Sequence, residues 1–198
     1  ESQNKTMLQE RSSARREVRR LRSHEGAVLC VRYTADGAYC MSAGADRSVK
    51  LWNPGREGLD GTGALLIKSY DGSHAAEVTG VAIAADSGRF VSCGADKVAV
   101  VWDVRTGRAL RRLEGHAGRV NAVALAGDAV VATAGYDNAV RLWDLRTQAF
   151  RDRKPLQKID GCFNDSVTSV GFRGAKMTTT SVDGCVRTHD LRRGLLDC

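Results

Sequence analysis

Internal repetition is the feature that most constrains how this 198-residue chain can fold. Four segments share one pattern, and an aspartate holds the same place in each, at Asp46, Asp96, Asp137 and Asp183, with spacings of 50, 41 and 46 residues. A repeat of this length is a supersecondary unit that buries its apolar face by stacking against its neighbours. The chain should therefore fold as an array of four similar units.

Each unit reads as three short strands joined by turns. In the first, VLCVRYT leads to a turn at Asp36–Gly37, YCMSAGA leads to a turn at Asp46, and SVKLWN closes the unit. β-Branched residues bounded by Asp and Gly are strand and turn signals, and no helical period is found in the body of the chain. The fold class is therefore all-β. The four segments are Val28 to Trp52, Val78 to Trp102, Val120 to Trp143 and Val167 to His189.

Two inserted loops explain why the spacings differ. NPGREGLDGTG at 53–63 and RTQAFRDRKP at 146–155 should each lie between the third and fourth strands of a unit, where extra length costs little entropy. The spacing is then close to the roughly 40–45 residues of a four-stranded propeller blade. We predict blades over residues 24–70, 74–113, 116–159 and 163–198.

Blades of this width normally form a ring of about seven, so we expect four blades of a seven-bladed ring, with this chain as a fragment of it. EVRRLR at 17–22 fits the outer strand of the blade at which such a ring closes. An open arc would leave two blade faces uncovered, both carrying apolar strands. We therefore expect the isolated chain to aggregate or unfold unless a partner covers these faces.

A set of four polar or aromatic residue types recurs in the first three units. A histidine, a hydroxyl and a carboxylate could form a nucleophilic triad, but an enzyme needs such a site once and not in every unit. The hydroxyl-to-Asp step is 4 and the Asp-to-Trp step is 6 in all three units. We interpret each set as structural: Asp accepts from the His ring, and the other ring nitrogen meets the hydroxyl, which faces the indole N–H. The tetrads are His24, Ser42, Asp46 and Trp52; His74, Ser92, Asp96 and Trp102; and His116, Thr133, Asp137 and Trp143.

These tetrads, with the dipeptides Trp102–Asp103 and Trp143–Asp144 and the variant Trp52–Asn53, resemble the WD-repeat family over residues 17–198. The resemblance implies a β-propeller of WD repeats, without catalytic activity or a cofactor. Longer runs such as YCMSAGADRSVKLWNPGREG and SVDGCVRTHDLRRGLL are similar to one branch of the family. That likeness implies a protein-interaction scaffold that gathers components of a kinase cascade, is found with the spliceosome, and occurs in both cytoplasm and nucleus.

The fourth unit departs from the family pattern. Phe163 stands where His is expected and His189 where Trp is expected, although Thr179, Asp183 and Asp190 keep their places. We expect this blade, over 163–198, to lack the full tetrad.

Charge is concentrated at the amino-terminal end. The net charge is +7, and residues 1–22 hold +4 of it. We expect 1–16 to be a flexible basic arm, either a solvated terminus or a site of attraction to acidic protein or RNA. The arm favours an alternative function as an RNA-binding subunit, which the nearly neutral body and 6% aromatic content weaken. The arginines of this region are Arg11, Arg15, Arg16, Arg19, Arg20 and Arg22.

Function should then depend on surfaces that bind other proteins. The segments before each first strand and the turns between second and third strands share one rim of a propeller, which is our candidate binding site. Tyr136 is its expected anchor, although a half-buried turn residue is an equally good interpretation. The inserted loops lie on the opposite rim and could serve a second partner. The rim residues are Glu25, Arg47, Glu77, Lys97, Arg119, Tyr136, Asn138 and Asp165.

Several other classes of function find no support in the sequence. No apolar run approaches the roughly 18 residues that a membrane-spanning helix needs, and no phosphate loop or metal cluster is found. A small-molecule substrate is not expected. The six cysteines have no CxxC pair and should be unbridged thiols in a reduced compartment, with Cys40 and Cys93 as small buried residues.

Overall fold

The computed structural model describes residues 20–58, 63–146 and 154–193, and these residues form strands with one short 3-10 helix, η1 (Leu191–Arg193). The all-β prediction is confirmed. The described part of the chain contains no helix that is long and apolar enough to cross a membrane.

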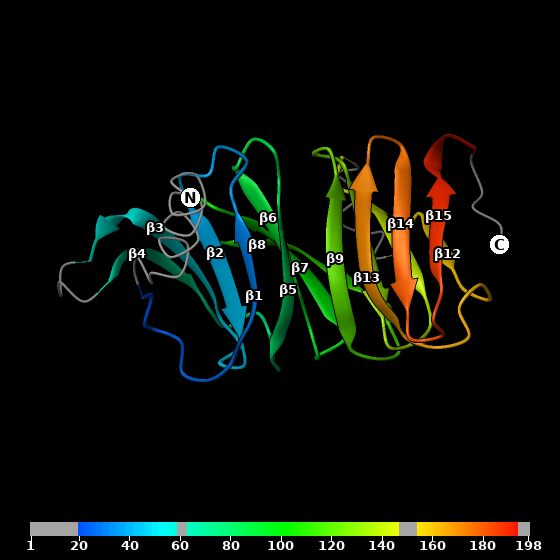
Figure 1. The fold of residues 1–198 in the computed structure, drawn as a ribbon, viewed down its shortest axis with the longest axis horizontal. Helices are drawn as coiled ribbons and strands as arrows, with labels where there is room; N and C mark the ends of the chain where they lie inside the picture. The colour runs from blue at the N-terminus through cyan, green and yellow to red at the C-terminus, as the bar shows by residue number, and fades with distance from the viewer. Residues whose placement is uncertain (1–19, 59–62, 147–153, 194–198) are drawn as a thin grey trace, which may run out of the picture.

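Four antiparallel sheets follow one another along the chain, one for each predicted blade (Figure 1). The first is β1 (Val28–Tyr33), β2 (Cys40–Gly44), β3 (Val49–Glu57) and β4 (Ala64–Tyr70). The second is β5 (Val78–Ile83), β6 (Arg89–Gly94), β7 (Val98–Asp103) and β8 (Ala109–Glu114). The third is β9 (Val120–Ala126), β10 (Val130–Gly135), β11 (Val140–Asp144) and β12 (Gln157–Ile159). The fourth is β13 (Val167–Arg173), β14 (Lys176–Ser181) and β15 (Val186–Asp190).

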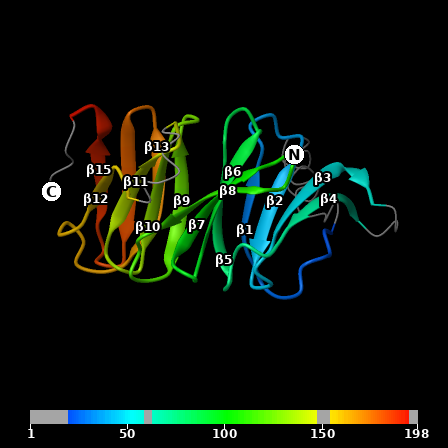
Figure 2. The same ribbon diagram turned by 180° about the vertical axis from the view of Figure 1, so that it is seen from behind.

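The sheets stack face to face as an open arc, with the inner strands β1, β5, β9 and β13 in a row (Figures 1 and 2). Three apolar clusters fill the three spaces between neighbouring sheets. Between the first two, the Tyr70 ring meets the edge of Phe90 with centroids 4.8 Å apart, and Phe90 stacks on Trp102 at 5.7 Å. Alternating side chains of β-strands produce this arrangement, because every second residue faces the next sheet.

Neighbouring blades are also joined by side chains at repeated positions. On the inner strands, Thr79 donates to the Val120 carbonyl at 2.5 Å, and Asn121 donates to the Val167 carbonyl at 2.8 Å. On the outer strands, Lys68 reaches the Arg105 carbonyl and Arg111 the Asp144 carbonyl, both at 2.8 Å. These contacts hold each blade in register with the next.

The last blade exposes a polar face where the others bury an apolar one. Four positions of the second and third strands form the face that each blade turns toward its successor. In blade 4 they are Thr178, Thr180, Val186 and Thr188, and all but the half-buried Thr180 are exposed. The prediction that both uncovered faces carry apolar strands is therefore wrong for blade 4. The matching sets are Met41, Ala43, Val49 and Leu51 in blade 1; Val91, Cys93, Ala99 and Val101 in blade 2; and Ala132, Ala134, Val140 and Leu142 in blade 3.

The expected outer strand at 17–22 does not form over its described part, residues 20–22. Arg20 instead lies against Gly63, next to the start of β4 in blade 1. An outer strand needs the free edge of a third strand to pair with, and β15 is at the far end of the arc (Figure 1). Residues 17–19, and with them Arg19, lie outside the described residues.

The cysteine prediction is partly wrong. Cys40 and Cys93 are buried free thiols, and Cys30 and Cys185 are also free. Cys162, however, is disulfide-bonded. Burial raises the pKa of the Cys93 thiol to about 12, which keeps it protonated and unreactive.

Candidate functional site

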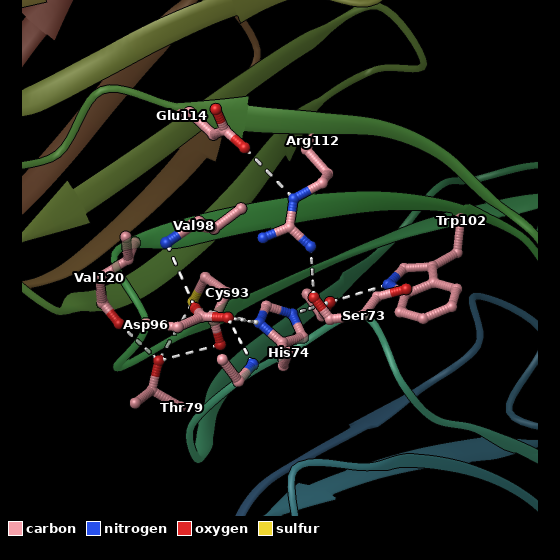
Figure 3. A network of polar contacts seen from close by, with 12 residues as sticks. Ser73, His74, Thr79, Cys93, Asp96, Val98, Trp102, Arg112, Glu114 and Val120 are labelled. Carbon is pink, nitrogen blue, oxygen red and sulfur yellow. Dashed lines mark hydrogen bonds and ion pairs between the residues drawn. The ribbon is translucent and has the colours of Figure 1, made fainter.

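The tetrad of blade 2 is a continuous chain of hydrogen bonds (Figure 3). The Trp102 indole donates to Ser92 Oγ at 2.8 Å, and this hydroxyl is 2.7 Å from His74 Nε2. His74 Nδ1 lies 3.0 Å from Asp96 Oδ2, which also accepts from the Ala75 backbone N–H at 3.0 Å. Each polar group of this tetrad has a hydrogen-bond partner if His74 Nδ1 carries the proton and Ser92 donates to His74 Nε2.

The same chain of contacts recurs in blades 1 and 3. His24 joins Asp46 at 2.8 Å and Ser42 at 2.7 Å. In blade 3 the corresponding histidine-to-carboxylate and histidine-to-hydroxyl distances are both 2.8 Å, for His116 with Asp137 and Thr133. The indoles donate to the hydroxyls at 2.8 and 2.9 Å, from Trp52 to Ser42 and from Trp143 to Thr133.

These contacts have the order of a nucleophilic triad, but the burial of the hydroxyls argues against that chemistry. The hydroxyls of Ser92 and Thr133 belong to residues with 0% exposure, so no substrate carbonyl can approach them. Each oxygen already accepts from an indole N–H. The geometry supports a structural role, in which the tetrad joins the turn to the core of the blade.

The turn carboxylates are held as anions. Burial opposes this, but hydrogen bonds from Ser48 and His24 lower the pKa of Asp46 to about 2. The pKa values of Asp96 and Asp137 are also lowered, because their histidines donate to them. Burial lowers the pKa of His116, which keeps that ring neutral at physiological pH.

The residue after each turn aspartate has a left-handed backbone. Arg47, Lys97 and Asn138 have φ values of 65°, 70° and 54°, and blade 4 has Gly184 at 82°. Such values are uncommon for residues other than glycine, and they tighten the turn so that the preceding carboxylate points inward to its histidine. The sequence carries a signal for this backbone in blades 3 and 4, where Asn138 and Gly184 occupy the position, but none in blades 1 and 2.

The residue before each turn aspartate is fixed by one repeated contact. Its backbone N–H donates across the rim to the carbonyl three residues after the His position, at 2.8–2.9 Å in every blade. Ala45 and Ala95 occupy this place in blades 1 and 2, whereas Tyr136 and Val182 occupy it in blades 3 and 4, with 64% and 59% exposure. The exposure of Tyr136 decides against its interpretation as a half-buried residue. Val182 was not predicted as a rim residue from the sequence, although alignment of the four turns shows that it is equivalent to Tyr136.

The remaining predicted rim residues are spread over all four blades. Arg119 and Glu77 form an ion pair at 3.1 Å that crosses from blade 3 to blade 2. Asp165 accepts from the Ser166 backbone N–H at 2.6 Å. Most of this rim is exposed, namely Glu25, Arg47, Lys97, Arg119, Tyr136 and Asp165, whereas Glu77 and Asn138 are half-buried.

Blade 4 replaces its tetrad by a different arrangement. Phe163 stands at the position of the missing histidine. The Arg187 guanidinium pairs with Asp183 at 2.9 Å and lies 5.2 Å from the centre of the Phe163 ring. Asp183 still accepts from the Asn164 backbone N–H at 3.1 Å. His189 Nε2 is buried without a hydrogen-bond partner within the part of the chain that the structure describes.

A cation four residues after the turn aspartate was not predicted from the sequence. Lys50, Arg141 and Arg187 lie 3.7, 2.8 and 2.9 Å from the turn carboxylates of blades 1, 3 and 4. The equivalent residue of blade 2 is Val100. Because Val100 interrupts the series in blade 2, the repeat pattern does not predict a cation at this position.

Neither a metal site nor most of the basic arm is found among the described residues. No group of three or more His, Cys, Asp or Glu side chains that could hold a metal occurs in 20–58, 63–146 or 154–193. Of the basic arginines, Arg20 and Arg22 are exposed. Arg11, Arg15 and Arg16, like the rest of 1–16, lie outside the described residues.

The stacked antiparallel sheets and the repeated tetrads define an arc of a β-propeller. The chain belongs to the WD-repeat family: the family described as WD domain, G-beta repeat matches residues 15–53, 65–103 and 107–144. Each of these three segments contains one complete tetrad.

Known proteins are similar to most of the chain. The WD repeat domain-containing protein 83 homolog of Dictyostelium discoideum is 29% identical over 89% of this chain and 59% of its own length. The U5 small nuclear ribonucleoprotein 40 kDa protein of the same organism is 25% identical over 88% of this chain and 46% of its own length. Pre-mRNA-splicing factor cwf17 of Schizosaccharomyces pombe is 27% identical, over 85% and 47%. The chain thus spans about half the length of these relatives.

Solved propellers have the same fold. The WD40 propeller domain of Doa1 superimposes with a TM-score of 0.70 at 26% identity, over 85% of this chain and 52% of that chain. The structure of U3-55K superimposes with a TM-score of 0.74 at 20% identity, over 88% and 52%.

Proposed function

We propose that this chain is a non-catalytic scaffold that holds other proteins together within a nuclear pre-mRNA splicing assembly. The observation that carries the proposal is the rim of blades 3 and 4, where Tyr136 and Val182 are exposed on a backbone fixed by the same hydrogen bond. Exposed aromatic and apolar side chains on a rigid frame, ringed by charged residues, are typical of protein-binding hot spots.

The splicing context rests on relatives. A ribonucleoprotein subunit and a pre-mRNA-splicing factor by name each resemble more than four-fifths of this chain. The tetrads support the non-catalytic role, because the hydroxyl of every His–hydroxyl–Asp set is buried and bonded within its blade. The kinase-cascade role and the cytoplasmic location remain predictions from the family resemblance.

Replacement of the rim tyrosine tests the proposal. The chain with Tyr136→Ala should recover about tenfold less of its splicing partners from nuclear extract, since loss of a hot-spot side chain costs at least about 1.4 kcal/mol. The matched control is Tyr39→Ala, which removes an exposed tyrosine beside the first hairpin of blade 1, on the opposite rim. Quantitative mass spectrometry of crosslinked complexes measures the recovery. Equal recovery of splicing proteins by both variants and the parent would overturn the proposal.

A further inference from the structure

The hairpins between the first and second strands of the blades differ in charge. They lie on the rim opposite the turn aspartates, and those of blades 1, 2 and 3 contain Asp36, Asp86 and Asp128. The hairpin of blade 4 has no acidic residue. Instead, Arg173 and Lys176 flank its two-residue turn. Blade 2 also has a cation at the place of Lys176, namely Arg89, but its hairpin contains Asp86 as well.

Arg173 and Lys176 face each other directly. They are the last cross-strand pair of β13 and β14, both side chains are exposed, and neither forms an ion pair within the described residues. Like charges at directly opposed positions destabilise a hairpin. Asp190 lies across from Lys176 on β15, but the Arg192 guanidinium already holds it, at 2.8 and 3.1 Å. The fold therefore keeps a local repulsion that an external anion would relieve.

Neighbouring segments bring more cations to this corner. The Leu191 N–H donates to the Ala175 carbonyl at 2.9 Å, which fixes the segment of Arg192 beside the hairpin. In blade 3 the corresponding contact joins the Leu145 N–H to the Ala129 carbonyl at 2.7 Å, and Arg146 follows. Arg146 is held by Asp144, and Asp128 is an exposed acid on the same rim. The cationic corner consists of Arg146, Lys154, Arg173, Lys176 and Arg192, all exposed.

We propose that the cationic corner binds the phosphates of single-stranded RNA without reading its sequence. The charges come from the ends of separate segments on one rim, and charges spread in this way suit the repeated phosphates of a strand better than one carboxylate. Arg146 and Arg192 are paired with Asp144 and Asp190, so Arg173 and Lys176 carry the charge of the corner that forms no ion pair within the described residues. This site is separate from the arm at 1–16, and its existence does not depend on the scaffold role of the opposite rim.

The test measures binding of a labelled oligouridylate of about 15 nucleotides to the full chain by fluorescence anisotropy. Arg173→Thr with Lys176→Thr should weaken binding about tenfold at about 50 mM salt, because two phosphate contacts are lost. The salt slope should fall by about 1.4, so that between about 50 and about 200 mM the variant loses about sevenfold less affinity than the parent. The melting temperature should not fall, because the change removes a repulsion.

A matched control removes the same charge elsewhere. Arg47→Asn with Lys97→Asn takes two cations from the turn rim, and asparagine tolerates the left-handed backbone there. This control should bind the RNA within about twofold of the parent. Binding of the corner variant that equals the control would overturn the proposal. A second result would also overturn the proposal. If polyglutamate of equal charge displaced the RNA, and the corner variant bound polyglutamate as much more weakly as it binds RNA, the ligand would be an acidic protein segment.

Discussion

The turn aspartates are the residues on which the polar contacts of each blade converge. Asp96 accepts from the His74 ring and from the backbone N–H groups of Ala75 and Val98. Asp96→Ala should lower the free energy of unfolding by about 1–3 kcal/mol, since it leaves buried donors without partners. Urea titration measures the loss, and Asp128→Ala, an exposed aspartate, is the control. A variant that unfolds like the parent but loses a hydrolytic activity would contradict the structural role.

Acid should unfold the chain through the same residues. The pKa of Asp46 is near 3.8 in an unfolded chain and about 2 in the fold, so its contribution is complete above pH 4 and is lost as the pH falls toward 2. Burial lowers the pKa of His116, so protonation of that ring already removes stability below about pH 6.5. Denaturant unfolding at a series of pH values should show a shallow decline and then a steep one. An unfolding free energy that is constant from pH 5 to pH 3 would contradict this account.

The tetrads could be predicted residue by residue because their spacing repeats in three units. Val182 could not, because an isolated valine carries no signal until the turns are aligned and Tyr136 shows what that place exposes. The cation at Lys50, Arg141 and Arg187 was hidden for a related reason, since Val100 interrupts the series. A sequence shows which residue type stands at a position, whereas the exposure of its side chain and its ion pairs depend on the neighbouring strand.

Among the elements, blade 4 shows what replaces a lost tetrad. His189 occupies the tryptophan position with its Nε2 buried and unpaired within the described residues, and its ring centroid is 6.4 Å from that of Phe163. His189→Phe removes an unsatisfied polar atom at similar volume. It should leave the free energy of unfolding unchanged or raise it by about 1 kcal/mol, as measured by urea titration.

The matched substitution in an intact tetrad should have the opposite effect. His74→Phe removes a ring that serves both Ser92 and Asp96, and it should cost about 1–3 kcal/mol. Equal losses in the two variants would show that His189 has a partner of its own in solution.

The pairing of the strand expected at residues 17–22 could not be predicted from the sequence. EVRRLR has the pattern of an outer strand, and the family match begins at residue 15, in the register in which β4 and β8 lie in the next two repeats. Yet residues 20–22 form no strand. A strand exists only with an edge to pair with, and that edge is a property of the assembled arc rather than of the segment.

The whole arc has two unlike ends. The inner strand of blade 1 exposes Val28, Val31 and Tyr33, with 54%, 52% and 61% exposure, at places where later blades bury their residues against a neighbour. The face of blade 4 instead presents three threonines beside one exposed apolar residue, Val186. The repeat pattern predicted apolar surfaces at both ends, because the shared strand pattern does not show that blade 4 has threonines at the positions facing outward.

This asymmetry limits how copies of the chain can associate. Open polymers need two complementary faces, whereas one adhesive face permits only a closed, two-fold pair. Light scattering should therefore show a monomer that dimerises as its concentration rises, and Val31→Thr with Tyr33→Thr should shift it toward monomer.

Thr178→Val with Thr188→Leu gives blade 4 the apolar character of blades 1 to 3, so this variant should form species that keep growing with concentration. Large aggregates of the parent chain would show that the threonine face associates despite its hydroxyls. A parent that stays monomeric at every concentration would show instead that the exposed residues of β1 are too few to hold two copies together.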